Sequence, residues 1–480
     1  MKPYYITTTL PYVNAKPHIG FALEIIQADV LARFYRFCGY EVIFNTGTDE
    51  HGQKIYEKAL KEGKEPKVYV DEYARKFDAL KQALNLSYTH FIQTSDPAHK
   101  QAAQTFWLRC LEKGDIYKAR YQVKYCVGCE LEKTDSELVD DHCSVHPNLE
   151  LQLVDEENYF FRFSHYQQQL LELYGQRPDF VVPENRLKEI KTFVEGGLKD
   201  FSVSRIKAKM PWGVPVPNDE EHVMYVWFDA LVNYISTLGW PDENSSFKNF
   251  WPGVQVAGKD NLRQQSAMWQ AMLISAGIES SKQIFIHGFI TSSGQKMSKS
   301  LGNVVDPFEM VEEYGTDALR YYLLREIPSH DDGDFSRERM EQRYTELANR
   351  LGNLVSRVAA MAQKYFEGKL VVVSIDWSGR EKVLEGALKQ YDFRMYIDQV
   401  FEVVDQANEE IDRKAPFKLV KEDKAAAELV LSKVCEQIRF IGRALEPILP
   451  QTSQEILRRY GTIVQTGEAL FPRRDERNIP

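Results

Sequence analysis

The sequence predicts an α/β fold in which a parallel sheet is split by a small β-rich insertion and followed by an all-α helical bundle. Three observations predict it. Strands alternate with helices up to residue 115 and again from 183, short alternating runs fill 116–182, and helical periodicity dominates from about 340. A chain of 480 residues, 43% of them hydrophobic, can form about three domains with separate cores. It has no apolar run of the ~18 residues that a membrane span needs.

The first 115 residues predict half of a Rossmann-like parallel sheet. Residues 4–13 are rich in β-branched and aromatic residues, which favours a strand. A helical pattern over 21–37 and a second strand over 41–47 follow, an order typical of parallel sheets with functional groups at the carboxyl ends of strands. The apolar spacing of the helix predicts a buried stripe of Ala22, Ile26, Val30, Phe34 and Phe37. The charged residues expected on its other faces are Glu24, Asp29 and Arg33.

The rest of the chain completes this organisation. Residues 116–182 alternate apolar and polar residues over short runs, as an inserted β-rich module would. The strand and helix alternation of the sheet then resumes over 221–293. Long helical patterns over 339–366 and 425–449, with a break at 367–382, predict a helical bundle.

Charge and cysteine content exclude several classes of protein. The net charge of −10, from 60 basic and 70 acidic residues, argues against a protein that coats nucleic acid through a basic surface. Six cysteines are too few for a disulfide scaffold, and the N-terminus lacks the apolar core of a signal peptide. We therefore expect a cytoplasmic protein without membrane association.

Three of the cysteines and one histidine form a metal-ligand pattern. Cys126, Cys129, Cys143 and His146 have the spacing C-x2-C-x13-C-x2-H, which supplies four ligands from two turns for a tetrahedral Zn²⁺. No open coordination position would remain, so we expect one structural zinc per chain. The alternative is three thiols near a surface histidine without a metal, and His142 is a rival ligand.

Two short motifs point to a nucleotide. The string His18-Ile19-Gly20-Phe21 stands where a strand gives way to a helix, so the amides at the helix start could bind an anion. A histidine there could equally be an ordinary capping residue. Residues 294–302, Gly-Gln-Lys-Met-Ser-Lys-Ser-Leu-Gly, form a glycine-flanked loop with two lysines. Lysines taken singly could just be solvated.

Together with the helical last third, these motifs resemble the class I aminoacyl-tRNA synthetases. Within that class, the strings PYVNAKPHIG, TGTDEHG, YVWFDAL, AGKD and KMSKSLGNVVDP are similar to methionyl-tRNA synthetases over nearly the whole chain. The resemblance implies activation of methionine by ATP and transfer of the methionyl group to tRNA(Met), initiator and elongator, with release of AMP and pyrophosphate. It also implies a monomer, because the extra C-terminal domain with which some family members dimerise is absent.

Activation is an attack by a carboxylate on the α-phosphate of ATP, so donors must stabilise charge on the phosphates. His18 can donate to an α- or β-phosphate oxygen, while Lys296 and Lys299 can close over the β- and γ-phosphates, with Mg²⁺ sharing the neutralisation. By resemblance, the nucleotide site also includes Gly20, Phe21, Glu24, Gly258, Asp260 and His287. Asp260 suits ribose hydroxyls but could instead cap a helix. The family usually has a second histidine at Phe21, so a strictly two-histidine mechanism is not expected.

A thioether is apolar, so aromatic contacts are expected to select methionine. By resemblance, Asp49 receives the α-ammonium, and the side-chain pocket consists of Leu10, Tyr12, Trp227, Ala230, Leu231, Tyr234, Asn261, Gln265 and Trp269. The alternative for Tyr225, Trp227 and Tyr234 is an ordinary aromatic core. The family commonly has Ile, Phe and His where this chain has Asn261, Gln264 and Gln265. Gln265 can still donate a hydrogen bond toward the sulfur.

The helical third is expected to read an anticodon by hydrogen bonds to base edges and by stacking. By resemblance, Asn353 and Arg357 share one helix face, and Phe417 stands where the family usually has Trp. A Phe ring can stack but has no indole donor. The alternative places Asn353 in helix packing and Phe417 in the core.

The resemblance also gives the domains their roles. The two halves of the catalytic domain are expected at 1–115 and 183–287, and the connective insertion with its zinc knuckle at 116–182. The KMSKS loop and stem-contact linker are expected at 288–345, and the anticodon-binding domain at 346–480. Two other functions remain open. One is a class I synthetase for leucine, isoleucine, valine or cysteine. The other is a zinc-containing RNA-binding protein that has lost adenylation.

Overall fold

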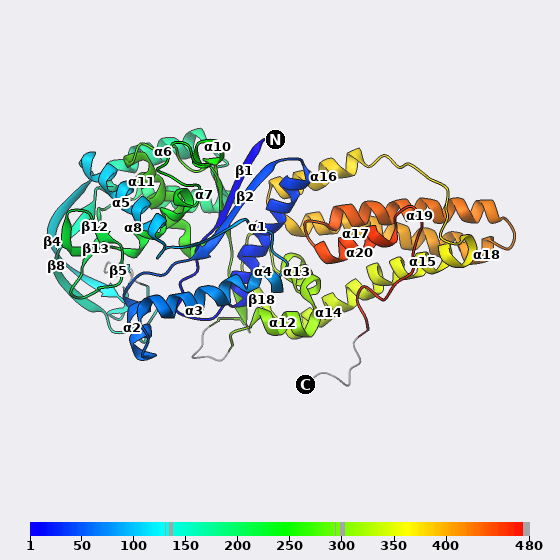
Figure 1. Ribbon diagram of the computed structural model, residues 1–480, viewed down its shortest axis with the longest axis horizontal. Coiled ribbons are helices and arrows are strands. Elements are labelled where there is room, and N and C mark those ends of the chain that lie inside the picture. Colours follow the sequence, from blue (N-terminus) through cyan, green and yellow to red (C-terminus); the bar gives the residue numbers. More distant parts are fainter. Residues whose placement is uncertain (130, 134–137, 293, 298–302, 474–480) are drawn as a thin grey trace. The chain divides into compact units, whose positions relative to one another are not determined.

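The computed structural model describes residues 1–129, 131–133, 138–292, 294–297 and 303–473 (Figure 1). The chain divides into two compact units. The first consists of Met1–Pro17, Gly39–Lys81 and Tyr88–Ile286, and the second of His18–Cys38, Gln82–Ser87 and His287–Pro480. Among the described residues, no helix combines the length and the apolar character that crossing a membrane requires.

A six-stranded parallel sheet forms the centre of the first unit, as the sequence predicts. Its order is β3 (His90–Gln93), β2 (Glu41–Thr48), β1 (Pro3–Thr8), β14 (Val254–Gly258), β15 (Gln283–His287) and β9 (Val181–Val182). From β1 the chain proceeds outward to β2 and β3 on one side, and β14 and β15 lie on the other side. The order reverses beside β1, and at such a switch point the carboxyl ends of parallel strands open a crevice for ligands.

Short and medium helices surround this sheet (Figure 1). They are α2 (Gln53–Lys61), α3 (Pro66–Asp78), α4 (Leu80–Ala83), α5 (Pro97–Glu112), α6 (Gln167–Gln176), α7 (Glu184–Glu195), α8 (Val226–Ala230), α9 (Asn233–Ser236), α10 (Phe247–Phe250) and α11 (Trp269–Ser275). A π-helical turn, Gln264–Met268, leads directly into α11. Because the turn adds a residue to the helical repeat, it redirects the side chains that it carries.

The insertion is an antiparallel sheet built on two long strands. β4 (Ile116–Cys126) pairs with β8 (Gln152–Phe161), and β5 (Leu131–Lys133) and β10 (Phe201–Ser202) lie at the edges. A second antiparallel sheet contains β11 (Ser204–Ile206), β13 (Asp219–Met224) and β12 (Pro215–Val216). The prediction that residues 221–293 resume the parallel sheet is therefore wrong for its first strand, because β13 pairs with β11 and β12.

The second unit is mainly helical. Its helices are α1 (Ile19–Phe37), α12 (Pro307–Tyr314), α13 (Thr316–Arg325), α14 (Arg337–Glu346), α15 (Asn353–Phe366), α16 (Ser378–Lys389), α17 (Phe393–Lys414), α18 (Pro416–Leu419), α19 (Lys424–Leu445) and α20 (Pro450–Arg459). A small sheet consists of β17 (Gln295–Lys296), β16 (Ile290–Ser292) and β18 (Gly333–Phe335). The helical pattern over 339–366 corresponds to α14, a π-helical turn at Leu347–Gly352, and α15. The predicted break at 367–382 covers the connection between α15 and α16 but is wrong for 378–382, which form the start of α16.

Helix α1 is buried on more faces than its apolar stripe predicts. Four of the five stripe residues are buried, but Phe37 is 62% exposed, so its assignment to the stripe is wrong. Glu24 and Asp29, expected on other faces, are buried as well. Each has a polar partner: Glu24 Oε2 lies 3.0 Å from His287 Nε2, and Asp29 Oδ2 lies 2.9 Å from Arg320 Nη1. Partners from distant segments thus permit carboxylates to be buried on this helix.

Two arginines and a serine hold the Asp29 carboxylate. Arg33 Nε lies 2.8 Å from Asp29 Oδ2, and the Ser87 hydroxyl donates to Oδ1 at 2.6 Å. Arg320 also donates to main-chain oxygens of three other residues. Burial alone would raise the pKa of Asp29, but the two guanidinium groups hold it below the ordinary carboxyl value.

Replacing Asp29 by asparagine is expected to lower the free energy of unfolding by about 2 kcal/mol at neutral pH, because charge-assisted hydrogen bonds are lost. Since the folded-state pKa of Asp29 is depressed, its contribution is present above the ordinary carboxyl pKa and is lost as the pH falls through the folded-state value. Urea unfolding of parent and variant should show a difference at neutral pH that shrinks in acid. An equal difference at both pH values would contradict this assignment.

Candidate functional site

The two short motifs of the sequence lie next to each other in the second unit. Ile19, the first residue of α1, donates its N–H to the carbonyl of Val305, just beyond the KMSKS string, at 3.0 Å. A Cβ atom on Gly20 would lie 3.9 Å from Cε of Met297, the methionine inside that string. The fold therefore brings the lysine-bearing segment to the start of α1, although the two are far apart in the sequence.

His18 caps α1 through its side chain. Its Nδ1 accepts a hydrogen bond from Gly20 N at 3.1 Å, so the proton of the neutral imidazole is on Nε2. A Cβ atom on Gly20 would approach the His18 ring to 2.9 Å, which explains why glycine stands there. The capping interpretation is correct, and the cap also determines which ring atom is the donor. Phe21 follows with no polar side-chain atom.

The other predicted nucleotide-site residues are distributed over the two units. In the second unit, Lys296 contributes its backbone to β17, and Lys299 lies outside the described residues. In the first unit, Gly258 ends β14, and Asp260 is exposed in the 3₁₀ turn that follows. The N-cap of that turn is Gly258, so Asp260 does not hold the capping position of the alternative interpretation.

His287 and Glu24 form a buried pair in the second unit. His287 Nε2 is 3.0 Å from the Glu24 carboxylate, and Nδ1 is 2.7 Å from the carbonyl oxygen of Gly288. Both ring nitrogens thus face oxygen atoms of neighbouring groups. The pair fixes the orientation of the His287 ring against α1.

The segments predicted to bind methionine meet at the switch point of the sheet. Tyr12 follows β1, Asp49 follows β2, and Asn261 follows β14. The first two loops are joined, because Asp49 N donates to Pro11 O at 3.0 Å and Val13 N donates to Asp49 O at 3.2 Å. The other predicted residues are Leu10 after β1, Trp227 and Ala230 on α8, Leu231 just after it, and Tyr234 on α9.

The aromatic residues of this region differ in burial. Trp227 is partly buried, whereas Tyr225 and Tyr234 are buried. Tyr234 packs edge to face against Trp269, with ring centres 5.9 Å apart, and Trp269 stacks on Phe106 at 5.5 Å. A core role fits Tyr225 and Trp269, while the exposure of Trp227 is that of a pocket wall.

Gln265 lies in the π-helical turn before α11. Its Nε2 donates to the Tyr234 hydroxyl at 2.7 Å. Among the described residues, its buried Oε1 has no hydrogen-bond partner. A tyrosine hydroxyl can donate or accept, so either end of the amide can bond to Tyr234 and leave the other end for a ligand.

The four predicted zinc ligands converge. Their ligand atoms all lie within 4.8 Å of one another. Cys129 Sγ is 3.5 Å from Cys143 Sγ and 3.1 Å from His146 Nδ1. Tetrahedral zinc with bonds of ~2.3 Å to sulfur separates its ligands by ~3.8 Å, so this donor set fits the metal.

Local structure explains the convergence. β4 ends at Cys126, and Cys143 lies in β7 (His142–Cys143), which pairs with β6 (Leu138–Val139). A Cβ atom on Gly128 would lie 2.7 Å from the His146 ring, so the turn requires glycine. The rival ligand His142 is exposed, with Nδ1 2.7 Å from the Asp140 carbonyl, and it is not part of the cluster.

The predicted anticodon residues lie at the surface of the second unit. Asn353 is exposed at the start of α15, and Phe417 in α18 is 44% exposed. These exposures contradict the alternative in which both are packed in the interior. Arg357 Nη1 lies 2.9 Å from Asp412 Oδ1 in the last turn of α17, so the predicted face of α15 contacts the helix end that precedes Phe417.

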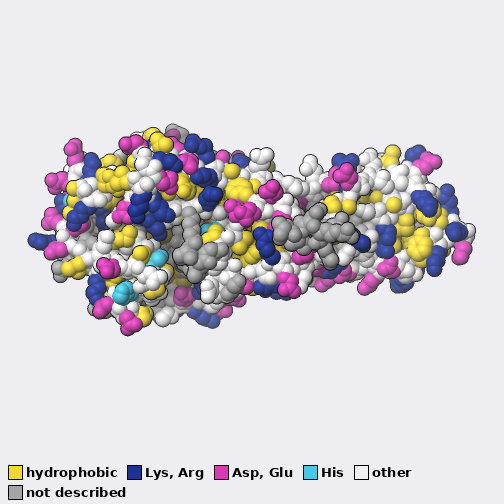
Figure 2. Space-filling view, turned by 90° about the horizontal axis from the view of Figure 1, so that it is seen from below, with side chains coloured by type: hydrophobic (Ala, Val, Ile, Leu, Met, Phe, Trp, Pro, Cys, Tyr) yellow, Lys and Arg dark blue, Asp and Glu magenta, His cyan; other side chains and the backbone are white. Residues whose placement is uncertain are grey.

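The face of the molecule drawn in Figure 2 shows no continuous basic surface among the described residues. On the face drawn in Figure 2, Lys and Arg side chains are interspersed with Asp and Glu, in keeping with the net charge of −10. Lys414, Lys418 and Lys421 are exposed around Phe417.

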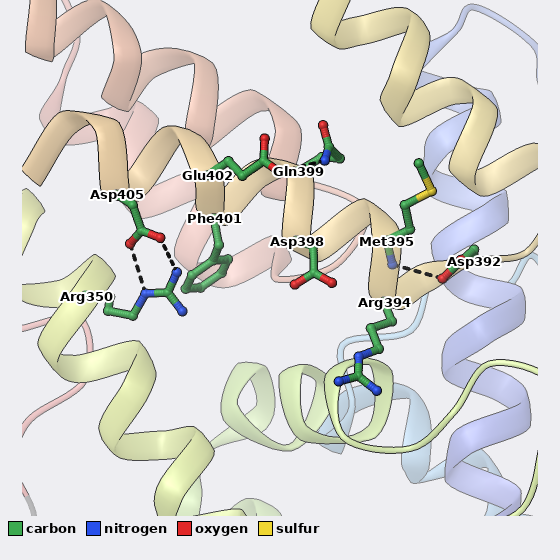
Figure 3. A pocket seen from close by; sticks show the side chains of 9 residues that line it. All are labelled: Arg350, Asp392, Arg394, Met395, Asp398, Gln399, Phe401, Glu402 and Asp405. Atoms are coloured by element: carbon green, nitrogen blue, oxygen red, sulfur yellow. Dashed lines mark hydrogen bonds and ion pairs between the residues drawn. The ribbon is translucent and has the colours of Figure 1, made fainter.

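A cavity of about 490 Å³ lies along α17 (Figure 3). Its lining includes four carboxylates, and Arg350, which forms an ion pair with one of them, Asp405, at 2.7 Å. Excess negative charge disfavours a phosphate ligand. The cavity is therefore unsuited to the backbone of a nucleic acid.

A buried histidine–aspartate pair lies in the region of the predicted methionine site. His51 Nδ1 lies 2.9 Å from Asp229 Oδ2, and both side chains are almost completely buried. Both residues stand in the strings TGTDEHG and YVWFDAL. His51 lies two residues after Asp49, and Asp229 lies two residues after Trp227, so the sequence places each near a predicted methionine-site residue. Only the fold shows that His51 and Asp229 contact each other.

Comparison with protein families gives one match, to the family described as tRNA synthetases class I (M), over residues 4–146 and 128–359. The methionine–tRNA ligase of Thermosynechococcus vestitus is 43% identical over 492 aligned positions, which cover 98% of this chain and 93% of that protein. That of Thermotoga maritima is 41% identical, covering 99% of this chain and 81% of that protein.

Solved structures are similar over the same extent. Mycobacterium tuberculosis methionyl-tRNA synthetase in complex with methionyl-adenylate has a TM-score of 0.94 at 36% identity, covering 98% of this chain and 100% of that chain. The apo form of the same enzyme has a TM-score of 0.87 at 34% identity, covering 99% of each chain.

Proposed function

Because the chain belongs to the class I methionyl-tRNA synthetases, we propose that the start of α1 and the KMSKS segment act together on ATP. The chain catalyses the ligation of methionine to tRNA(Met). Methionine and ATP give methionyl-adenylate and pyrophosphate, and transfer of the methionyl group to tRNA releases AMP. The two alternatives left open by the sequence, a synthetase for another amino acid and an RNA-binding protein without adenylation, therefore fall away.

The contact of α1 with the KMSKS segment carries this proposal, through the bond from Ile19 N to Val305 O and the approach of Met297 to Gly20. Negative charge develops on the phosphate oxygens as the methionine carboxylate attacks and pyrophosphate leaves. His18 donates from Nε2 to an α- or β-phosphate oxygen. Lys296 and Lys299 neutralise the β- and γ-phosphates, and Mg²⁺ that accompanies ATP shares this charge.

Phe21 cannot supply a second imidazole, so more of the charge stabilisation falls to the two lysines. Glu24, Gly258, Asp260 and His287 complete the proposed nucleotide site, with Asp260 directed to the ribose. Exchange of pyrophosphate into ATP measures the activation step directly. Exchange that does not depend on methionine, or no exchange at all, would overturn the proposed site.

Asp49 is the proposed acceptor for the α-ammonium of methionine. The thioether is surrounded by Leu10, Tyr12, Trp227, Ala230, Leu231, Tyr234 and Asn261, and Gln265 is its polar neighbour. Gln265 supports this assignment because one end of its amide bonds to Tyr234 and the other end lacks a partner among the described residues. A donor from this amide would distinguish sulfur from a methylene group.

Replacing Gln265 by leucine is expected to reduce discrimination between methionine and norleucine, which has a methylene in place of sulfur. We expect kcat/KM for methionine to fall about fivefold to tenfold, the scale of one neutral hydrogen bond, while kcat/KM for norleucine changes less. Gln264→Leu is the matched control, since Gln264 is the adjacent buried amide of the same turn. A ratio that is unchanged, or that shifts equally in both variants, would refute the role of Gln265.

The second step positions the 3′-terminal hydroxyl of tRNA(Met) against the adenylate. Asn353 and Arg357 are proposed to bond to anticodon bases and Phe417 to stack on one of them, for both initiator and elongator tRNA. Their exposure and the three lysines around Phe417 support this role. Base stacking of this kind contributes about 1–3 kcal/mol per base.

Cys126, Cys129, Cys143 and His146 are proposed to hold one structural Zn²⁺ per chain. Four protein ligands close the coordination shell, so the metal would stabilise the turn and take no part in activation. A monomeric state and a cytoplasmic location are further proposals. The predicted domain boundaries remain proposals. Two strands do not follow them, since β9 within 116–182 belongs to the parallel sheet, and β10 beyond 182 pairs with β8 of the insertion.

A further inference from the structure

His51 and Asp229 form a buried side-chain pair in the first unit. His51 Nδ1 lies 2.9 Å from Asp229 Oδ2, and the two residues are 1% and 0% exposed. Among the residues that the structure describes, none of the four polar side-chain atoms of the pair has a hydrogen-bond partner of good geometry, so the 2.9 Å contact is the polar contact that each side chain has. Burial raises the pKa of Asp229, and His51 opposes that rise. Each side chain therefore depends on the other for compensation.

His51 belongs to the turn after β2 that carries Asp49. The His51 carbonyl accepts a hydrogen bond from the Tyr12 hydroxyl at 2.7 Å. On the other side of the turn, the Trp212 indole donates to the Glu50 carbonyl, and its ring centre lies 5.6 Å from that of His51. The imidazole is thus held between Trp212 and Asp229, and its main chain helps to orient Tyr12.

Asp229 lies on α8, between Trp227 and Ala230 of the proposed thioether pocket. A second link joins the same elements, because Asn45 of β2 donates to Asn233 Oδ1 of α9 at 3.1 Å. Together the two links fix α8 and α9 against β2. The distance between Trp227 on α8, which is proposed to contact the thioether, and Asp49, which is proposed to bind the α-ammonium, then stays constant.

Among the described charged and titratable groups around Asp229, His51 is the one that contacts it directly. His99 Nδ1 lies 2.9 Å from Ser236 Oγ, and burial lowers the pKa of His99 to about 3, so that ring is neutral. Lys100 interacts with Asp229 at longer range. Losing His51 would leave the Asp229 carboxyl buried without a contacting donor.

We propose that His51 and Asp229 are positioning residues for methionine, which tie α8 to the Asp49 turn so that both ends of the amino acid are held at once. This inference rests on the proposed methionine site. It does not involve the nucleotide, so a break in the pair should weaken methionine binding selectively. Neither residue has to touch the substrate for this effect.

Two conservative variants of His51 test the proposal. The amide nitrogen of asparagine is two bonds beyond Cβ, as Nδ1 of histidine is, so His51→Asn can still donate to Asp229. The amide of glutamine is one bond further out, so His51→Gln loses that contact while it keeps similar bulk. We expect His51→Gln to raise KM for methionine about tenfold with KM for ATP within about twofold, and His51→Asn to stay near the parent.

His222→Gln is the matched control. His222 Nδ1 lies 3.1 Å from Asp219 Oδ2 in β13, a histidine–aspartate pair of the same unit in another sheet. We expect it to leave both KM values unchanged even where it lowers the melting temperature. Equal KM for methionine in His51→Gln and His51→Asn, or an equal rise in KM for ATP, would overturn the proposal.

Asp49→Asn separates failure of this inference from failure of the proposed site. If Asp49→Asn raises KM for methionine and His51→Gln does not, the positioning role alone is wrong. If Asp49→Asn has no effect, the proposed methionine site is wrong, and the positioning role is wrong with it. Should His51→Gln not fold, Asp229→Asn must show the same selective rise, and a normal KM for methionine there would also overturn the proposal.

Discussion

Replacing His18 by alanine is expected to slow methionine-dependent pyrophosphate exchange by about 10²–10³-fold, the cost of removing one donor to a developing oxyanion. The donor is Nε2, because Nδ1 accepts the hydrogen bond from Gly20 N at 3.1 Å. Since Phe21 offers no second imidazole, no neighbouring side chain of the motif can replace it. Initial rates at saturating methionine and ATP measure the loss.

His18→Asn separates donation from capping. The asparagine oxygen reaches the position of Nδ1 and can still cap α1, whereas the Nε2 donor is removed. We expect this variant to be as slow as His18→Ala but to keep the parent melting temperature, while His18→Ala also loses about 1 kcal/mol of cap stability. An exchange rate near that of the parent in His18→Asn would mean that His18 only caps the helix.

Removal of the metal is expected to unfold the turn that joins Cys126 to His146. Peptides with structural zinc sites bind Zn²⁺ with a free energy of about 10–16 kcal/mol near neutral pH. Because the site does not exist in the unfolded peptide, this free energy stabilises the folded state. A strong chelator, or Cys129→Ser, should release one zinc per chain. Amide hydrogen exchange should then accelerate at Cys126–Gly128 and at the residues around His146. The described residues of this turn are not part of the hydrophobic cluster that packs against the six-stranded sheet, so the sheet should keep its protection.

His142→Ala is the control for the metal site, because His142 is exposed and lies outside the ligand cluster. We expect this variant to keep its full zinc content and His146→Ala to lose it. Purified protein without zinc, or loss of zinc in His142→Ala alone, would contradict the assigned ligand set.

Local patterns predicted most of the fold, and contacts between distant segments account for what they did not. Spacing alone predicted α1, but not the burial of Glu24 and Asp29, because His287 and Arg320 come from far along the chain. The strand over β13 was recognised, yet its pairing partners were not, since alternation does not specify which sheet a strand joins.

The site divides in the same way. The zinc ligands could be predicted because their spacing is local, and the fold then distinguished His146 from His142. The π-helical turn at Gln264–Met268 left no recognisable signal, because its residues also suit an ordinary helix. The pairing of His51 with Asp229 depends on the packing of α8 against the end of β2. No local pattern in the sequence predicts this packing.

The most direct test of the central claim is a double-mutant cycle on methionine-dependent pyrophosphate exchange, with His18→Asn and Lys299→Ala singly and together. If an imidazole and an ammonium group act on the same triphosphate, each single variant is slow and the double variant loses less than the product of the two. We expect a coupling energy of at least ~0.5 kcal/mol. The claim would be contradicted if the fold-loss in exchange rate of the double variant equalled the product of the two single losses. It would also be contradicted if Lys299→Ala exchanged pyrophosphate at the parent rate.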